Sequence, residues 1–396
     1  MNPTPRLPLL PTLSLALGQT LIWAATFYLF PALLLHFEAE TDWSKTELTA
    51  AFTGSLLVAA GFSATMGRFI DAGSGSRAMI GGMIAAATIL VGLSQATEYW
   101  QFALAWLLIG VTMAASLYEP CFAMLVRHLG DQARPAITRI TLVAGFAGTV
   151  AFPLANWIAA DAGWRLAVLA FAALVVLAAL PATIFGLTQL KKLPIADAGT
   201  PSTNGNPKKH RYAFWLLAIA FALTAINHGM LINHLLPLLA ERGVGSVLAV
   251  TAASVIGPMQ VFGRVVMIAT ERSVSTRATT IFCFLAMTAA IVCLFLAGAA
   301  TWLIFAFIML HGAPWGVMSI VRPAVTRDVL GGAGFGLKSG RINALSLAGS
   351  ALAPFGGALI WQLSGYSAML MVAFVLMIAA SVIIVAGTAR NRGVSC

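Results

Sequence analysis

The sequence predicts an all-α polytopic membrane protein with twelve transmembrane helices in two pseudo-symmetric six-helix bundles. Of its 396 residues, 60% are hydrophobic and only 9% are charged, and the mean hydropathy is +0.91. This composition lies far outside the range of globular domains. The apolar residues form runs of about twenty, the length that an α-helix needs to cross the hydrocarbon core of a bilayer. Runs of this length with so few charges do not fit a transmembrane β-barrel.

Twelve apolar segments, separated by short polar joints, are expected to cross the bilayer. The first is expected to be an uncleaved signal anchor, because no small-residue cleavage site follows its apolar run. The expected spans are residues 13–36, 46–66, 78–95, 100–126, 136–159, 165–187, 212–239, 246–268, 278–298, 301–325, 340–362 and 366–388.

The lysines and arginines in the joints predict the orientation. Twelve spans place both termini on one side, and the joints of the opposite side hold only Lys45, Arg165 and Arg242. Cytoplasmic loops carry the excess of Lys and Arg in membrane proteins. We therefore expect a multi-pass protein of the cytoplasmic (inner) membrane with both termini in the cytoplasm. This arrangement accounts for the net charge of +10 without a nucleic-acid partner.

The segment 188–211 predicts a cytoplasmic linker, because it is rich in Pro, Gly, Ser and Lys and shows no periodicity. It divides the chain into an N-terminal six-helix bundle, residues 1–187, and a C-terminal six-helix bundle, residues 212–396. The two bundles show an internal sequence repeat. An acidic residue precedes an arginine by six positions in both, Asp71 before Arg77 and Glu271 before Arg277, at an offset of 200 residues. Such duplication is typical of secondary transporters, whose site lies between the repeats.

The loop after the second span carries Gly67, Asp71, Gly75 and Arg77 and resembles the signature loop of the major facilitator superfamily. This resemblance covers the whole chain. The segment DWSKTELTAAF, the YEP of the fourth span and the Gly-Arg of the eighth resemble the monocarboxylate porter and oxalate/formate antiporter branch. The resemblance implies a secondary active, proton-coupled transporter of a small, monocarboxylate-like organic anion that works by alternating access.

An alternative function is a proton-driven efflux antiporter for a drug or toxic compound. The glycine pattern typical of such antiporters in the fifth span is only partly present, because Gly145 and Gly148 match it but no glycine precedes Pro153.

Ionisable residues inside the spans are the best candidates for the transport site, because a charge there is costly and is kept mainly for function. Arg264 lies seven residues before Glu271 of the following cytoplasmic loop, and Gln260 shares its helix face. A guanidinium beside a carboxamide can bind a carboxylate through parallel hydrogen bonds. The resemblance likewise implies a substrate-anchoring Arg in this helix, often with an Asp where Gln260 stands. The alternative is a structural Arg that bonds helix-end carbonyls.

Glu119 is the candidate for proton coupling, since it lies eight residues before Arg127 and therefore roughly 12 Å from the helix end. Pro120 frees a backbone carbonyl one turn earlier. Arg322 occupies the matching place in the second bundle and is expected to contribute to the substrate site. In the alternative, Glu119 pairs permanently with Arg139 as a brace.

Three further polar residues are candidate substrate contacts. Asn227 and His234 share a face of the seventh span, and Tyr28 lies in the first. The resemblance implies that both spans line the central cavity.

The loop residues Gly67, Arg68, Asp71 and Arg77 are the candidate gating residues. Gly67 permits close helix packing, and Asp71 can cap a helix N-terminus and pair with an Arg.

No enzyme activity is expected, because no catalytic set falls in a loop large enough to fold around a substrate. The segment 331–339 resembles a phosphate-binding loop, but Leu337 separates its last glycine from Lys338 and no strand precedes it. Four cysteines without CxxC spacing indicate neither a metal site nor a disulfide framework. We expect no cofactor and no metal, a monomer in the lipid bilayer, and a small organic anion and protons as partners.

Overall fold

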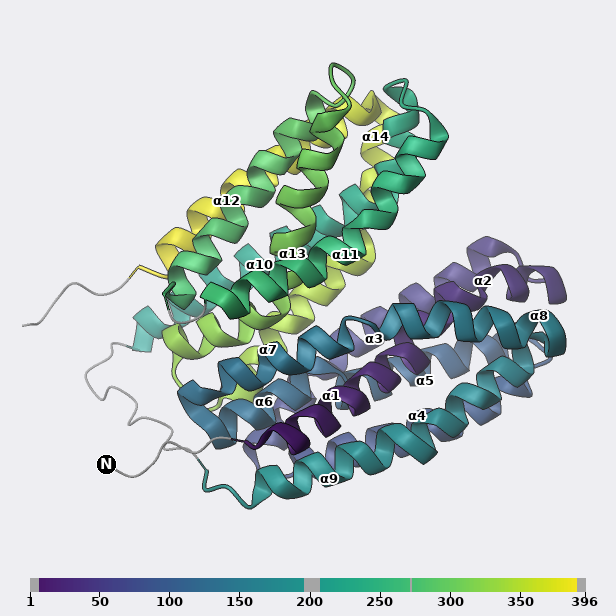
Figure 1. Cartoon of the computed structure of the whole chain (residues 1–396), viewed down its shortest axis with the longest axis vertical. Coiled ribbons are helices and arrows are strands. Elements are labelled where there is room, and N and C mark those ends of the chain that lie inside the picture. Colours follow the sequence, from purple (N-terminus) through teal and green to yellow (C-terminus); the bar gives the residue numbers. More distant parts are fainter. Residues whose placement is uncertain (1–6, 196–206, 271–272, 390–396) are drawn as a thin grey trace, which may run out of the picture. The chain divides into compact units, whose positions relative to one another are not determined.

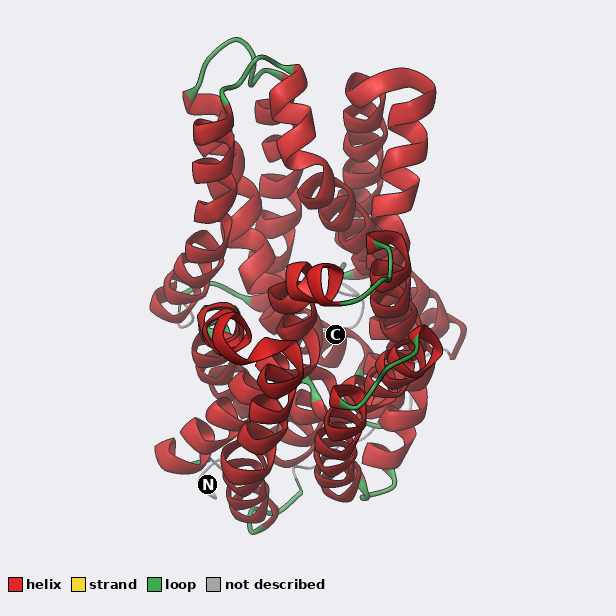
Figure 2. Ribbon diagram, turned by 90° about the vertical axis from the view of Figure 1, so that its right-hand side faces the viewer, coloured by secondary structure: helices red, strands yellow, loops and turns green. Residues whose placement is uncertain are grey.

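The computed structural model describes residues 7–195, 207–270 and 273–389, and all regular structure in these ranges is helical (Figure 2). Figure 1 labels the helices. The first nine are α1 (Leu9–Trp23), α2 (Leu29–Glu40), α3 (Lys45–Asp71), α4 (Gly75–Ser94), α5 (Tyr99–Ser116), α6 (Tyr118–Leu129), α7 (Ala133–Ala144), α8 (Ala147–Leu174) and α9 (Leu180–Lys191). The others are α10 (Pro207–Glu241), α11 (Ser246–Thr270), α12 (Thr276–Phe295), α13 (Trp302–Leu330) and α14 (Phe335–Gly387).

The number of spans agrees with the twelve that the sequence predicts. Ten helical stretches of the described ranges are long and apolar enough to cross a membrane. Two of them, 133–191 with 59 residues and 335–387 with 53, are each long enough to cross twice. Each of these two is broken once at a glycine with positive φ, Gly163 in α8 and Gly365 in α14. Counting each broken stretch as two spans gives twelve.

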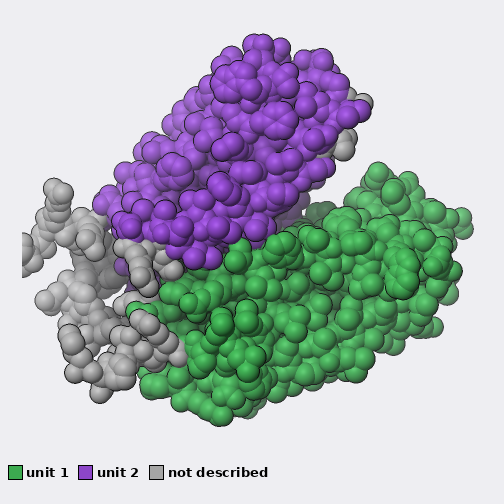
Figure 3. Space-filling view, viewed as in Figure 1, with its two compact units in different colours: residues 1–199, 332–344 green, residues 200–331, 345–396 purple. Residues whose placement is uncertain are grey.

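The chain forms two compact units, coloured separately in Figure 3. Unit 1 contains residues 1–199 and 332–344, and unit 2 contains residues 200–331 and 345–396. The first turns of α14 therefore belong to unit 1. Of the predicted linker 188–211, the first residues extend α9 to Lys191 and the last ones begin α10 at Pro207. Residues 196–206 of that linker, and the Glu271 of the sequence echo, lie outside the described residues.

The internal repeat extends to the backbone conformation. Gly130 follows α6 with φ 58°, and Gly331 follows α13 with φ 73°. Gly163 and Gly365 break α8 and α14 with φ 77° and 76°. The partners of each pair are 201 and 202 residues apart. L side chains rarely adopt such φ values, so glycine is required at matching points of both halves.

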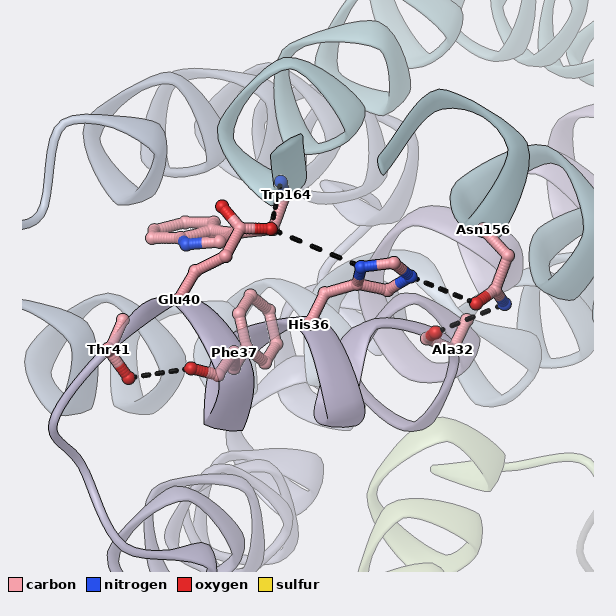
Figure 4. A network of polar contacts seen from close by, with 7 residues as sticks. All are labelled: Ala32, His36, Phe37, Glu40, Thr41, Asn156 and Trp164. Atoms are coloured by element: carbon pink, nitrogen blue, oxygen red, sulfur yellow. Dashed lines mark hydrogen bonds and ion pairs between the residues drawn. The ribbon is translucent and has the colours of Figure 1, made fainter. Parts of the chain in front are cut away.

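The Gly163 break is held by a polar cluster at the end of α2 (Figure 4). The Trp164 N–H donates to Glu40 Oε1 at 3.3 Å. His36 lies between Glu40, at 4.0 Å, and Asn156, whose Oδ1 is 3.1 Å from the imidazole Nε2. A Cβ at Gly163 would lie 3.1 Å from Glu40 Oε2. The carboxylate thus satisfies a backbone N–H that the helix break exposes.

The outer surface of both units is apolar, as a bilayer requires. Large hydrophobic side chains are extensively exposed, for example Leu177 (77%) in unit 1 and Phe282 (65%) in unit 2. The interior of unit 1 also contains large side chains, and Trp106 is fully buried in an edge-to-face contact with Phe30. Exposure of so much apolar surface to water would be energetically costly, whereas the tails of membrane lipids can cover this surface.

Candidate functional site

The fourth transmembrane stretch is broken just before Glu119. Helix α5 ends at Ser116, Leu117 adopts an extended backbone (ψ −160°), and α6 begins at Tyr118. Pro120 has no N–H to donate to the carbonyl of Ser116, its partner in a continuous helix. The side chain of Gln19 on α1 takes that place, and its Nε2 donates to the Ser116 carbonyl at 2.9 Å. The freed carbonyl that the sequence predicts is therefore held by α1.

Glu119 lies in the first turn of α6 and is half-buried. Its Oε2 accepts a hydrogen bond of 2.9 Å from the hydroxyl of Ser339, in the first turns of α14. Arg139 is exposed and forms no ion pair with Glu119 in the described part of the chain. The structure therefore does not support the brace that was the alternative role of this glutamate. Arg322 is half-buried on α13 in unit 2, and its contribution to the substrate site stays a prediction.

Asp71 caps the N-terminus of α14. Its Oδ1 and Oδ2 accept hydrogen bonds from the backbone N–H groups of Gly336 and Leu337, both at 2.9 Å. A carboxylate is stabilised there by the unsatisfied N–H groups and by the helix dipole. Gly67 makes this approach possible, because a Cβ at that position would lie 2.1 Å from the carbonyl oxygen of Gly336.

The two arginines of the predicted gate do not take part in this contact. Arg68 is exposed and donates to Thr65 Oγ1 on its own helix. Arg77 is exposed and forms no hydrogen bond or ion pair with any described residue. The arginine that does reach the loop is Arg127 on α6, which donates to the backbone carbonyls of Ile70 and Asp71. The expected pairing of the Asp71 carboxylate with an Arg is therefore not seen among the described residues.

The contact with α14 continues along α3. The side-chain amide of Asn343 donates to Ser63 Oγ at 3.1 Å. A Cβ at Gly340 would lie 2.3 Å from the carbonyl oxygen of Ser63. The sequence gives no sign of these partners, because 280 residues separate Ser63 from Asn343.

Arg264 is buried in unit 2, with 7% of its surface exposed. Its Nε donates to the carbonyl of Gly316 on α13 at 3.0 Å. The two helices lie very close, since a Cβ at Gly316 would be 2.2 Å from the backbone oxygen of Gln260. This hydrogen bond agrees with the alternative of a structural Arg, as far as the Nε–H group is concerned. It also fixes the orientation of the guanidinium. The side chain of Gln260 is half-buried one turn away.

The other predicted substrate contacts are held by neighbouring helices. Asn227 is fully buried and donates to the carbonyl of Ala373 on α14 at 3.0 Å. His234 Nε2 lies 3.0 Å from the carbonyl oxygen of Pro354. Tyr28 ends a π-helical turn, Ala24–Tyr28, and its ring would contact a Cβ at Gly148. Asn227 and His234 therefore tie α10 to α14 within unit 2.

A histidine pair in unit 2 joins residues that the sequence does not connect. His228 Nδ1 on α10 lies 2.9 Å from His311 Nε2 on α13. The ring of His228 also stacks on Trp315, with centroids 3.6 Å apart. The 83 residues between the two histidines hide this contact from any local pattern.

Comparison with known proteins decides the family. A model of the Major Facilitator Superfamily matches residues 15–310. The chain belongs to this superfamily. It is thus a multi-pass membrane transporter, and the signature loop that the sequence predicts is the segment in which Asp71 caps α14.

Solved structures of this superfamily share the fold at low sequence identity. The human organic anion transporter MFSD10 (TETRAN) is 16% identical, with a TM-score of 0.71, covering 97% of this chain and 100% of that chain. The E. coli fucose:proton symporter FucP is 12% identical, with a TM-score of 0.73, covering 98% and 100%. The proton:xylose symporter XylE is 14% identical, with a TM-score of 0.65, covering 95% and 94%. No curated protein sequence matches the chain.

Proposed function

We propose that this major facilitator superfamily transporter carries a small, monocarboxylate-like organic anion across the cytoplasmic membrane by proton-coupled symport. The observation that carries the proposal is Arg264, a permanently charged side chain that is 7% exposed within an apolar span. A cation is costly at that depth and is retained mainly for function. The resemblance of the fold to an organic anion transporter supports the same substrate class.

The distribution of charge within the predicted spans favours an anion over a cation. Beyond the first two residues of each span, they contain three arginines and one glutamate, namely Arg139, Arg264, Arg322 and Glu119. A cationic drug would therefore meet a positive interior, whereas a carboxylate would lower the electrostatic cost of the buried Arg264. Arg264 is the proposed anchor, and Gln260, Tyr28, Asn227, His234 and Arg322 are the proposed polar surroundings.

Glu119 is the proposed site of proton coupling. It is the one acidic residue beyond the first two positions of any predicted span, it is half-buried, and it accepts a hydrogen bond from Ser339. A carboxyl in such a place can gain and lose a proton as the surroundings change during transport. The fold is shared with two proton-coupled symporters.

The contact between Asp71 and α14 is the proposed gate, with Gly67, Arg68 and Arg77 as its loop. Two hydrogen bonds from backbone N–H groups to a carboxylate form a contact that can be made and broken as a unit. We place this loop, both termini and the 188–211 segment in the cytoplasm, and we propose that the transporter works as a monomer.

Transport by the purified protein in liposomes tests the proposal. Radiolabelled lactate should accumulate when the outside is acidic, and an excess of unlabelled monocarboxylates should compete, whereas lipophilic cations should not. Proton-driven movement of a lipophilic cation in the absence of lactate uptake would refute the anion proposal and establish the efflux alternative.

A further inference from the structure

Unit 1 contains a groove on the surface formed by α3, α4 and α5, with a volume of about 490 Å³. Its wall is almost entirely apolar and is built from small residues on α4, namely Ala78, Gly81, Gly82 and Ala85. Gly81 is exposed, and no atom lies within 4 Å of the position that its Cβ would occupy. The groove is therefore open where these helices present their outer face.

Three polar side chains line the groove. Ser74 and Arg77 lie at the start of α4, whereas Thr112 is buried and its hydroxyl donates to the carbonyl of Ile109. Arg77 is exposed and forms no hydrogen bond or ion pair with any described residue. The guanidinium of Arg77 thus lies at one end of the apolar groove, where it can bind an anion.

The length of the groove matches one leaflet of a bilayer. From Ser74 to Ala85 the α4 axis rises by roughly 16 Å at about 1.5 Å per residue. The hydrocarbon core of a membrane is about 30 Å thick. The groove therefore begins at the level of the headgroups and ends near the bilayer midplane, which is the path of an acyl chain.

We propose that this groove binds one anionic phospholipid, with an acyl chain along Gly81, Gly82 and Ala85 and the headgroup phosphate on Arg77. The positive-inside rule places this end of α4 at the cytoplasmic leaflet, where anionic lipids attract arginine side chains. Arginine is suited to a phosphate because its planar fork donates parallel hydrogen bonds. None of the residues proposed for substrate binding or proton coupling lines this groove.

Two glycines of α4 supply a matched pair of variants. Gly81 lines the groove, whereas Gly92 lies outside it on the same helix, and both are exposed with open space at the Cβ position. Gly81→Leu adds a side chain to the groove, and no atom lies within 4 Å of its Cβ position. Gly92→Leu adds the same side chain elsewhere, and Arg77→Gln removes the charge at the mouth.

Native mass spectrometry of the delipidated full-length protein measures the binding of dioleoyl phosphatidylglycerol and of dioleoyl phosphatidylcholine. The wild type and Gly92→Leu should retain one phosphatidylglycerol, with about a fivefold preference over phosphatidylcholine, the factor expected from one basic residue near a membrane surface. Gly81→Leu should lose this lipid. Arg77→Gln should bind both lipids equally.

Three results would overturn the proposal. Equal binding of both lipids by all four proteins would show annular lipid only. Retention of the preference in Gly81→Leu, at an unchanged thermal unfolding temperature, would exclude the groove as the path of the chain. Displacement of the phospholipid by glycerol 3-phosphate at equal concentration would show that the site binds a phosphate and that the acyl chain adds nothing.

Discussion

The side chain of Gln19 on α1 takes up the backbone carbonyl of Ser116, four residues before Pro120. Both residues are buried, at 1% and 0% exposure. A carbonyl left without a partner in such a place costs about 1 to 3 kcal/mol. Gln19 therefore stabilises the break that sets Glu119 at the start of α6, although it belongs to a different helix.

The first prediction concerns this hydrogen bond. Gln19→Leu should lower the free energy of unfolding by about 1 to 3 kcal/mol, because the Ser116 carbonyl loses its partner. Pro120→Ala restores a backbone N–H that can bond the same carbonyl, so Gln19→Leu should cost much less in a Pro120→Ala background. Denaturant unfolding of the four proteins measures the coupling between the two positions. Strictly additive effects would show that the Gln19 amide does not serve this carbonyl.

The second prediction concerns the cap of α14. Asp71→Asn keeps the size of the side chain but removes the charge and one of the two acceptor oxygens. Closure of the proposed gate should weaken and turnover should slow, while substrate affinity stays largely intact. Asp161→Asn, an exposed residue of α8, is the matched control. The gating role is wrong if affinity is lost in Asp71→Asn while the conformational equilibrium, followed by a cysteine-accessibility assay, stays unchanged.

The third prediction concerns the break at Gly163. Its φ of 77° and ψ of 163° lie in a region that essentially only glycine occupies. Gly163→Ala should therefore destabilise the protein by about 1 to 3 kcal/mol, and the crowding against Glu40 adds to this cost. Gly92→Ala, in the last turn of α4 with open space at the Cβ position, should be neutral or stabilising. Equal melting temperatures of the two variants would contradict the assigned backbone conformation.

The fourth prediction concerns proton coupling. Glu119→Gln should abolish uptake driven by a pH gradient yet allow exchange of labelled for unlabelled substrate, because glutamine mimics only the protonated carboxyl. Glu38→Gln, an exposed residue of α2, should leave both activities intact. Uptake by Glu119→Gln with the pH dependence of the wild type would assign the coupling to another group, with His234 the next candidate.

Composition and periodicity are sufficient to predict the fold class. In a bilayer the backbone must satisfy its own hydrogen bonds, and an apolar segment does so by forming a helix. The repeat of about 200 residues is visible as an echo in the sequence and again as the glycine pairs of the backbone. The sequence does not show that α14 starts in unit 1, since this depends on the hydrogen bonds of Asp71 with residues 265 and 266 positions away.

The candidate site is only partly predictable from the sequence, because its hydrogen bonds also join residues that are far apart in the chain. Glu119 and Arg264 stand out because a charge within an apolar run is rare. Their partners do not, since Ser339 and the carbonyl of Gly316 belong to other helices. Pro120 identifies which carbonyl is left unpaired, but only the hydrogen bond from α1 to the end of α5 reveals that Gln19 supplies the donor. The sequence also offers no reason to choose Arg127 over Arg68 as the partner of the loop.

The binding of lactate to Arg264 variants, measured by isothermal titration calorimetry on the purified protein, tests the central claim most directly. Arg264→Lys keeps the charge but loses the planar fork, so affinity should fall by roughly 1.5 to 3 kcal/mol, the range for a hydrogen bond to a charged group. Arg264→Ala should show no binding, whereas Arg139→Lys, at an exposed position of α7, should bind as the wild type does. Wild-type affinity for lactate in a folded Arg264→Ala protein would contradict both the anchor and the proposed anionic substrate.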